Sequence, residues 1–273
     1  MRSMRVLMSW MHGGEIEAHP SVPEPRLDAD MRSLGARLYS EHCAVCHGVK
    51  GDGNGERAAQ LSPRPRDFTK GVYEFRSTPS GKLPTDEDLW TVISDGLHGT
   101  AMVPWISLSE SSRWALVAYV ESFSPRFATE TRATPLTVPK PPAETQELIE
   151  QGRKLYMKVG CANCHGTEGH GDGPALRREA VRPRDFTGGI FKRGSSMDDL
   201  YLTLRTGLNG TPMLSFEKAL TADESWALAA YVRSLIGGRG HSPATASANE
   251  AIRQQRLGMM IDMPGMGPTR MMR

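Results

Sequence analysis

Two short strings constrain this chain more than any other feature: CAVCH at 43–47 and CANCH at 161–165. Each has the form C-x-x-C-H, which is the attachment signature of a c-type haem. Two thiols at this spacing can form thioethers to the vinyl groups of one haem, and the histidine can then ligate the iron as its proximal ligand. The strings use all four cysteines of the sequence, so they predict two covalently bound haem c groups. The predicted attachment residues are Cys43, Cys46, Cys161 and Cys164, and the predicted iron ligands are His47 and His165.

Other uses of paired cysteines fit this pattern poorly. A zinc ribbon needs its two pairs roughly 15–20 residues apart, whereas positions 43 and 161 are 118 residues apart (161 − 43). A thioredoxin-like pair would lie beside a βαβ pattern, and the sequence has no such pattern. Two plain disulfides remain an alternative, but they do not explain a histidine directly after each second cysteine.

The sequence also repeats itself. RPRDFT at 64–69 recurs at 182–187, again 118 residues later. Further along, the offset falls to 111 for the glycines and threonine of two matching loops, 96–102 and 207–213. The change marks a seven-residue insertion in the first copy, around 77–86. Two copies indicate a duplication, because a solenoid needs three or more units.

The repeat predicts how the chain is divided. We expect an N-terminal extension over 1–28, a first domain over 29–124 and a second domain over 143–237. Prolines are frequent in 125–142, which predicts an extended and semi-rigid linker. Residues 238–273 form a Met-rich tail. We expect either a segment that is disordered or docks on a partner, or a Cu(I) site, because methionine thioethers suit Cu(I).

The pattern of apolar residues predicts an all-α fold. Amphipathic helices are expected at 30–40 and 145–157, each leading into a haem motif. Capping residues at Thr85, Ser109 and Thr221 predict further helix starts. Hydrophobic residues make up only 38% of the chain, and a bound porphyrin would add apolar surface to such a core.

The sixth iron position separates electron carriers from enzymes, because a filled position leaves no room for substrate. Met102 and Met213 each follow a Gly-x-x-Gly-Thr string at the same register of the repeat. A methionine often only fills a core gap, yet here it recurs in both copies. His98 competes in the first copy, but Asn209 stands at its equivalent position. The sequence therefore predicts Met102 and Met213 as the second axial ligands.

With these residues in view, each half resembles a class I cytochrome c domain, and the whole resembles the soluble dihaem c-type cytochromes. The resemblance implies two tandem class I domains, each a small helical bundle around a covalent haem. It also implies that Gly35 packs on Tyr119, and Gly152 on Tyr231, where the first and last helices cross. The second copy departs from the family by lacking a proline shortly after its methionine.

The repeated arginines call for a separate hypothesis. Arginine forms paired, charge-assisted hydrogen bonds to carboxylates, and each haem carries two propionates. We therefore expect one arginine of each pair to contact a propionate. The alternative is a solvent-exposed loop in which the arginines form ion pairs with Asp67 and Asp185. The candidates are Arg64, Arg66, Arg182 and Arg184.

The expected function follows from the resemblance. Two six-coordinate haems imply single-electron transfer in a bacterial respiratory chain, between periplasmic partners such as a dehydrogenase or quinol-oxidising complex and a terminal oxidase or reductase. A free carrier and a subunit of a larger complex both fit. The alternative is a dihaem redox enzyme, peroxidase-like or oxidising sulfur compounds, with one displaceable haem ligand.

The net charge and the hydropathy limit which classes of partner and which cellular compartment we expect for this chain. The net charge of +2 implies no bulk attraction to nucleic acid. No run of 18 apolar residues exists, so no membrane span is expected. Covalent haem attachment favours the periplasm, although the short apolar stretch at 6–11 gives no clear signal peptide.

Overall fold

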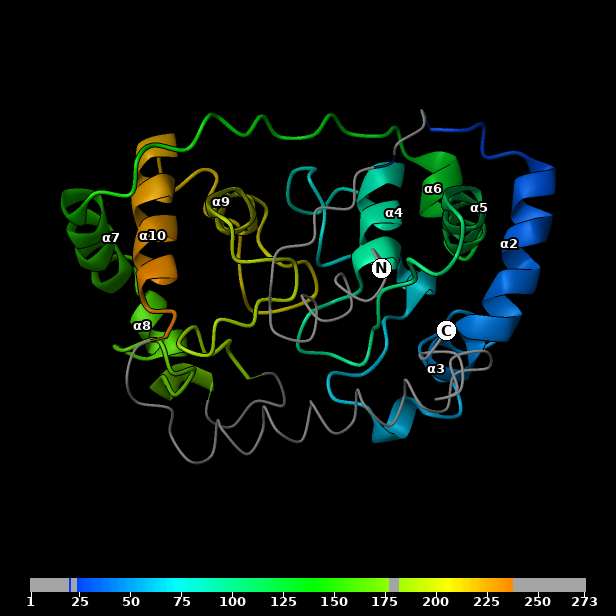
Figure 1. Cartoon of the computed structure of the whole chain (residues 1–273), viewed down its shortest axis with the longest axis horizontal. Helices are drawn as coiled ribbons and strands as arrows, with labels where there is room; N and C mark the ends of the chain where they lie inside the picture. Colours follow the sequence, from blue (N-terminus) through cyan, green and yellow to red (C-terminus); the bar gives the residue numbers. More distant parts are fainter. Residues whose placement is uncertain (1–19, 21–23, 177–181, 238–273) are drawn as a thin grey trace, which may run out of the picture.

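The computed structural model describes residue 20 and the ranges 24–176 and 182–237. Within these ranges the regular elements are all helices, which confirms the all-α prediction. Figure 1 shows two groups of helices side by side, α2 to α6 in one and α7 to α10 in the other. The Met-rich tail and most of the N-terminal extension lie outside the described residues.

The first half is built from helices whose starts are capped by side chains. Thr85 and Asp88 form a reciprocal capping box at the start of α4, and Ser109 accepts from a backbone N–H at the start of α5. Both predicted caps are confirmed. The elements are α2 (Ala29–His42), α3 (Ala44–His47), η1 (Ala58–Gln60), η2 (Phe68–Lys70), α4 (Asp86–Asp95) and α5 (Glu110–Glu121).

The second half repeats this order, except that no 3-10 helix corresponds to η2 among its described residues. Thr221 and Glu224 form a capping box at the start of α10, which confirms the third predicted cap, and Ser196 caps the helix before it. The elements are α7 (Gln146–Lys158), α8 (Cys161–His165), η3 (Pro174–Leu176), α9 (Met197–Thr206) and α10 (Ala222–Ser234).

A glycine lets the first and last helices of each half cross closely. A Cβ atom on Gly35 would collide with the Ala115 carbonyl of α5, and one on Gly152 would collide with the Ala227 carbonyl of α10. The added Cβ would also lie 2.8 Å from the Tyr119 β-carbon in the first half and 2.7 Å from the Tyr231 β-carbon in the second, which is closer than van der Waals contact allows. The close packing expected at these glycines is therefore confirmed.

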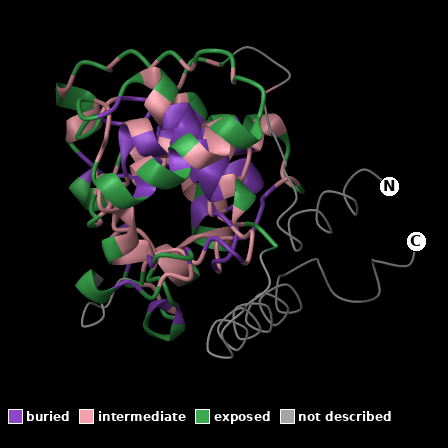
Figure 2. Ribbon diagram, turned by 90° about the vertical axis from the view of Figure 1, so that its left-hand side faces the viewer, coloured by how far each residue is buried: buried purple, intermediate pink, exposed green. Residues whose placement is uncertain are grey.

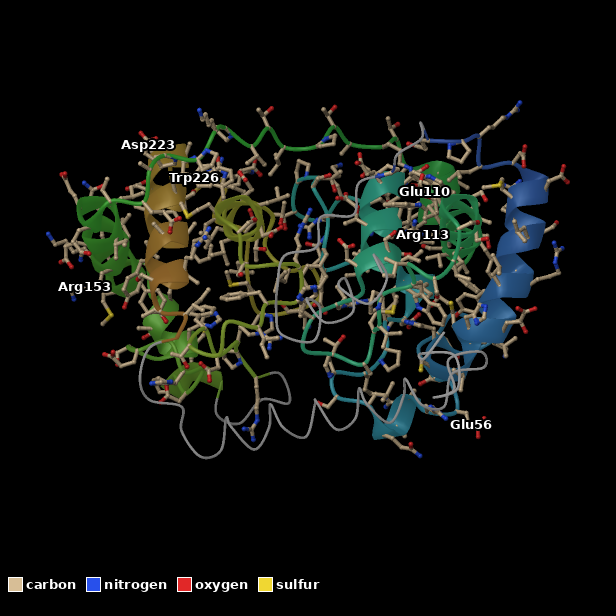
Figure 3. The ribbon with its side chains drawn as sticks, in the orientation of Figure 1. Glu56, Glu110, Arg113, Arg153, Asp223 and Trp226 are labelled. Carbon is tan, nitrogen blue, oxygen red and sulfur yellow. The ribbon has the colours of Figure 1, made fainter. Side chains whose placement is uncertain are left out.

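Each half has its own hydrophobic core, and Figure 2 shows the buried residues gathered among the helices. In the first half Trp90 and Trp114 stack with ring centroids 5.7 Å apart. In the second half Trp226 points from α10 toward α9, where it stacks on Tyr201 at 4.1 Å (Figure 3). Large aromatic contacts of this kind compensate for the low hydrophobic content of the chain.

The segment 125–142 is held against the first half. It begins with the short helix α6 (Arg126–Thr129) and then runs across to α7 (Figure 1). Arg126 donates to the Gly71 carbonyl at 2.6 Å. Arg132 donates to the Pro84 carbonyl at 2.9 Å, forms an ion pair with Asp86 and donates a hydrogen bond to Glu121. These contacts fix the course of the proline-rich segment.

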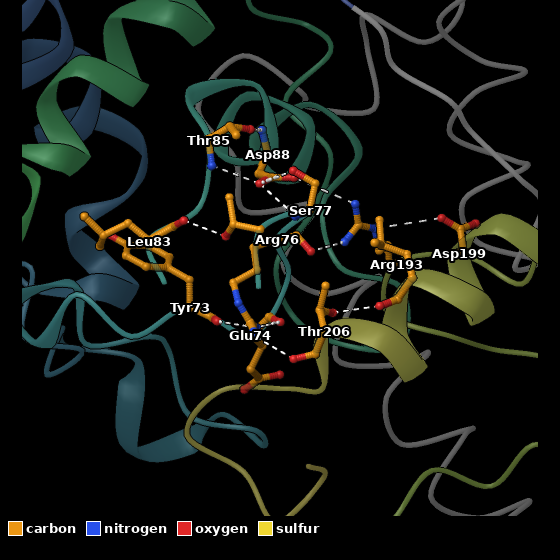
Figure 4. A network of polar contacts seen from close by, with 12 residues as sticks. Tyr73, Glu74, Arg76, Ser77, Leu83, Thr85, Asp88, Arg193, Asp199 and Thr206 are labelled. Carbon is orange, nitrogen blue, oxygen red and sulfur yellow. Dashed lines mark hydrogen bonds and ion pairs between the residues drawn. The ribbon is translucent and has the colours of Figure 1, made fainter. Parts of the chain in front are cut away.

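The halves also contact each other directly, through a buried arginine. Arg76 has no exposed surface and donates to the carbonyls of Thr206, at 2.5 Å, and Gly207, at 3.3 Å (Figure 4). These carbonyls end α9, where the helix dipole is negative and the last carbonyls need partners. Burial lowers the pKa of Arg76 to about 10, so the side chain stays charged at neutral pH.

The glycine crossing gives a first prediction. Alanine is normally favoured over glycine in a helix by about 1 kcal/mol, yet Gly152→Ala is expected to destabilise the protein by about 1–3 kcal/mol, because its Cβ meets the α10 backbone. Thermal unfolding would measure the change. Lys154→Ala, on an exposed position of the same helix, should stay within about 0.5 kcal/mol. An unchanged or raised melting temperature for Gly152→Ala would contradict the packing argument.

The linker contacts give a second prediction. Burial and hydrogen bonding to Asp86 raise the pKa of Glu121 to about 8. A carboxyl group with a raised folded-state pKa stabilises the fold at low pH, and this contribution is lost as pH rises from its usual value toward 8. The melting temperature of Glu121→Gln should therefore fall less between pH 5 and pH 8.5 than that of the wild type. Glu147→Gln, on the exposed surface of α7, should keep the wild-type slope, and equal slopes for all three proteins would refute the assignment.

Candidate haem sites

The two C-x-x-C-H strings lie at matching places, just after the first helix of each half. Tyr39 donates to the Gly48 carbonyl at 2.8 Å, and Tyr156 donates to the Gly166 carbonyl at 2.7 Å. Each tyrosine is buried in the helix that precedes the string. The bond therefore ties the residue after the histidine to that helix and fixes where the string lies.

The surroundings of the cysteines do not favour a redox pair or a thiolate site. No disulfide joins any two of them in this structure. Burial raises the pKa of Cys43 to about 12 and that of Cys161 to about 11. Thiols that exchange disulfides have a lowered pKa instead. The thioredoxin-like alternative is therefore not supported, and thioether formation suits these partly buried thiols.

Both histidines are oriented by a backbone carbonyl 19 residues further along. His47 Nδ1 lies 3.1 Å from the Arg66 carbonyl, and His165 Nδ1 lies 3.0 Å from the Arg184 carbonyl. A carbonyl can only accept, so Nδ1 carries the proton and Nε2 keeps its lone pair for a metal. Burial lowers the pKa of both histidines, which favours the neutral imidazole that ligates iron.

A phenylalanine from the same repeated string supports each imidazole ring. Phe68 stacks on His47 with centroids 4.5 Å apart, and Phe186 stacks on His165 at 4.3 Å. Their backbone N–H groups donate to Gly51 and Gly169. The RPRDFT string thus places both a carbonyl and a ring against each histidine. In the sequence the arginine charges are the conspicuous feature of this string, but its constant spacing from the histidine is the signal for this role.

The methionine loops have the same geometry in both halves. The Met102 carbonyl accepts from the Leu97 N–H at 2.9 Å, and its N–H donates to Thr100 Oγ1 at 3.1 Å. Met213 makes the same two bonds at the same distances, with Leu208 and Thr211. The threonine of the Gly-Thr-x-Met string therefore closes the loop and sets the methionine backbone.

The first half contains a cavity of about 560 Å³ that fits a haem-sized group. His47 and Met102 both line it, as do both cysteines of the first string. Tyr73 also lines the cavity, and its buried hydroxyl has no hydrogen-bond partner among the described residues. A carboxylate-bearing, otherwise apolar group would fill the space and satisfy this hydroxyl. The apolar walls include Leu89, Val92, Ile93, Leu97, Leu116 and Val120.

In the second half, Met213 is partly buried and packs against the same core as Cys161 and Ala162. Pro212, just before it, is exposed. The methionine thus lies against the core that carries the second haem string, and its ligand role stays a prediction.

The four arginines differ in their surroundings. Arg64 and Arg66 line the cavity of the first half, and Arg66 forms an ion pair with Glu74. Arg184 is partly buried, which lowers its pKa, whereas Arg182 is exposed. The alternative pairing with the neighbouring aspartates does not describe Arg66, which contacts a glutamate eight residues away.

Each half of the chain matches a family of known proteins, and the two families differ. The family described as cytochrome c matches residues 149–235, and the family described as cytochrome c oxidase, cbb3-type, subunit III matches residues 30–120. A solved structure from Kuenenia stuttgartiensis, titled as the reducing HAO-like protein complex Kustc0457/Kustc0458, contains a similar chain. The two chains are 44% identical with a TM-score of 0.73, over 74% of this chain and 96% of that one.

The chain belongs to the dihaem c-type cytochromes. It is similar to the cbb3-type cytochrome c oxidase subunit CcoP of Helicobacter pylori, with 24% identity over 63% of this chain and 50% of that subunit. It is also similar to the subunit FixP of Rhizobium meliloti, with 24% identity over 80% of this chain and 65% of that subunit. The cytochrome thus spans about half to two thirds of the length of these relatives.

The family and the cysteine strings together give the cytochrome two covalent haem c groups. The part of the chain that the structure describes has no helix long and apolar enough to cross a membrane. In the first half, the predicted haem ligands and attachment cysteines line one cavity. In the second half, the equivalent histidine and methionine make the same local contacts as in the first.

A third prediction concerns haem content. The Cys43→Ala/Cys46→Ala variant should bind one haem covalently instead of two, and so should Cys161→Ala/Cys164→Ala, because each pair serves its own half. The intact mass of the denatured protein would count the haems, and a pyridine haemochrome spectrum would confirm the stoichiometry. Wild-type haem content in either variant would contradict the assignment of one pair to each haem.

Proposed function

We propose that this cytochrome carries single electrons through two haems, each ligated by a histidine and a methionine. His47 and Met102 would ligate one iron, and His165 and Met213 the other. The observation that carries the proposal is that His47 and Met102 line one cavity, while the second half repeats the same histidine and methionine contacts. Such ligation fills both axial positions and raises the reduction potential.

The groups around each ligand suit electron transfer better than substrate chemistry. When bound, the haem supplies one-electron cycling between Fe(III) and Fe(II). The chain holds the histidine with a carbonyl and a phenylalanine, and it closes the methionine loop with a threonine. These fixed contacts keep both ligands in place when the charge changes, so little of the protein must rearrange. Arg64 and Arg66, in the wall of the first cavity, would face the haem propionates.

The relatives support a role within a larger redox assembly. The printed names of the matched proteins are those of oxidase subunits and of a protein complex. We infer that this cytochrome exchanges electrons with protein partners in the periplasm, either as a subunit or as a carrier. Partners of the expected kinds are a dehydrogenase or quinol-oxidising complex on one side and an oxidase or reductase on the other.

A fourth prediction tests the ligands. The oxidised wild type should show the methionine–iron charge-transfer band in the red for both haems. Met102→His should remove that band from one haem and lower its midpoint potential by on the order of a hundred millivolts, within the roughly 0.8 V range that axial ligands set. Met213→His should act in the same way on the other haem.

Met157→His provides the matched control. This methionine is 48% exposed on α7, so its replacement should change neither the band nor the potentials. A high-spin signal in the oxidised wild type would reject the closed, six-coordinate sites. It would favour the alternative enzyme with an open haem.

A further inference from the structure

The two halves meet at positions that are equivalent in the repeat. Glu74 and Lys192 are 118 residues apart, which is the offset of the surrounding strings. Lys192 Nζ lies 3.0 Å from Glu74 Oε2. Residues that are equivalent in the two copies therefore contact each other across the boundary between the halves.

A second pair of equivalent residues lies at the same boundary. Asp88 and Asp199 are 111 residues apart, the offset of the later part of the repeat, and each occupies the third position of its helix. The Arg193 guanidinium lies between them, 3.8 Å from Asp88 and 3.9 Å from Asp199 (Figure 4). Arg193 of the second half therefore lies between one carboxylate from each half.

Lys192 belongs to the second half, yet it lines the cavity of the first. Its carbonyl accepts from the His98 N–H at 3.0 Å, which anchors its backbone beside the methionine loop of the first half. Its ammonium lies 5.9 Å from the centre of the Phe75 ring. The Lys192 side chain is 21% exposed and that of Glu74 is 13% exposed, so their charges are only partly screened by water.

Glu74 joins this lysine to an arginine of the first half. One carboxylate oxygen contacts Arg66, and the other contacts Lys192. All three residues line the cavity. A single carboxylate between two cations leaves a net positive charge beside the space for the haem. Replacing either Lys192 or Glu74 by a neutral residue would change this net charge by one unit.

We propose that Lys192, a positioning residue from the second half, sets the reduction potential of the haem in the first half through its ion pair with Glu74. The proposal rests on the electron-transfer function proposed above. Ferric haem carries one more positive charge than ferrous haem, so a nearby cation disfavours the oxidised form and raises the midpoint potential. Glu74 has the opposite effect, and the pair tunes the potential as a unit.

A potentiometric titration of the intact dihaem protein tests this assignment. Lys192→Met should lower the midpoint of the haem of the first half, and Glu74→Gln should raise it. At a fixed solution potential each change should alter the ratio of reduced to oxidised haem by about threefold to tenfold, where tenfold corresponds to about 59 mV for a one-electron couple. The double variant should return close to the wild type. The titration of Met102→His identifies which midpoint belongs to that haem.

Controls separate charge from structure. Lys192→Arg keeps the charge and should keep the midpoint. Lys218→Met removes a lysine from an exposed position of the second half and should have no effect. Melting temperatures show whether each variant is folded.

Two outcomes would overturn the proposal. A folded Lys192→Met protein with an unchanged midpoint would do so, as would a midpoint that also moves in Lys192→Arg. Failure of the proposed function would look different, because the wild-type spectrum would then lack the methionine–iron band.

Discussion

The close crossing of the first and last helices is the constraint on which the rest of each half depends. Without a side chain at Gly35 or Gly152, the helix backbones touch. The first helix then carries a buried tyrosine whose hydroxyl holds the residue after the haem-binding histidine. The last helix follows the methionine loop in the chain. The contact between these two helices therefore helps to set how the haem string and its ligand loop approach each other, and in the first half both line one cavity.

Much of this architecture could be predicted because its signals are local or repeated. Capping residues such as Thr85, Ser109 and Thr221 mark helix starts through bonds to backbone groups only three residues away. The cysteine strings specify a cofactor by their own spacing. The repeat supplied what a single copy could not, since a methionine and a glycine that recur at one register are hard to attribute to chance packing. The internal repeat of the sequence thus identifies the candidate axial ligands.

The contacts between distant segments could not be predicted in this way. The sequence draws attention to the guanidinium groups of the repeated arginines, whereas the backbone carbonyls of Arg66 and Arg184 orient the histidines in the structure. Every residue has a carbonyl, so composition gives no hint of which one is used. Likewise, the insertion around 77–86 was visible only as a change of offset. That Arg76, the residue just before this insertion, is buried against the end of α9 depends on how the halves are placed, which no periodicity encodes.

The capping of α9 by Arg76 has a consequence for modularity. Gly207, whose carbonyl this arginine contacts, begins the loop that leads to Met213. The first half therefore supports the methionine loop of the second, while Lys192 of the second half completes the cavity wall of the first. The dependence runs in both directions across the interface. The duplicated halves are therefore not independent domains joined by a linker. Part of the site in each half is supported by residues of the other half.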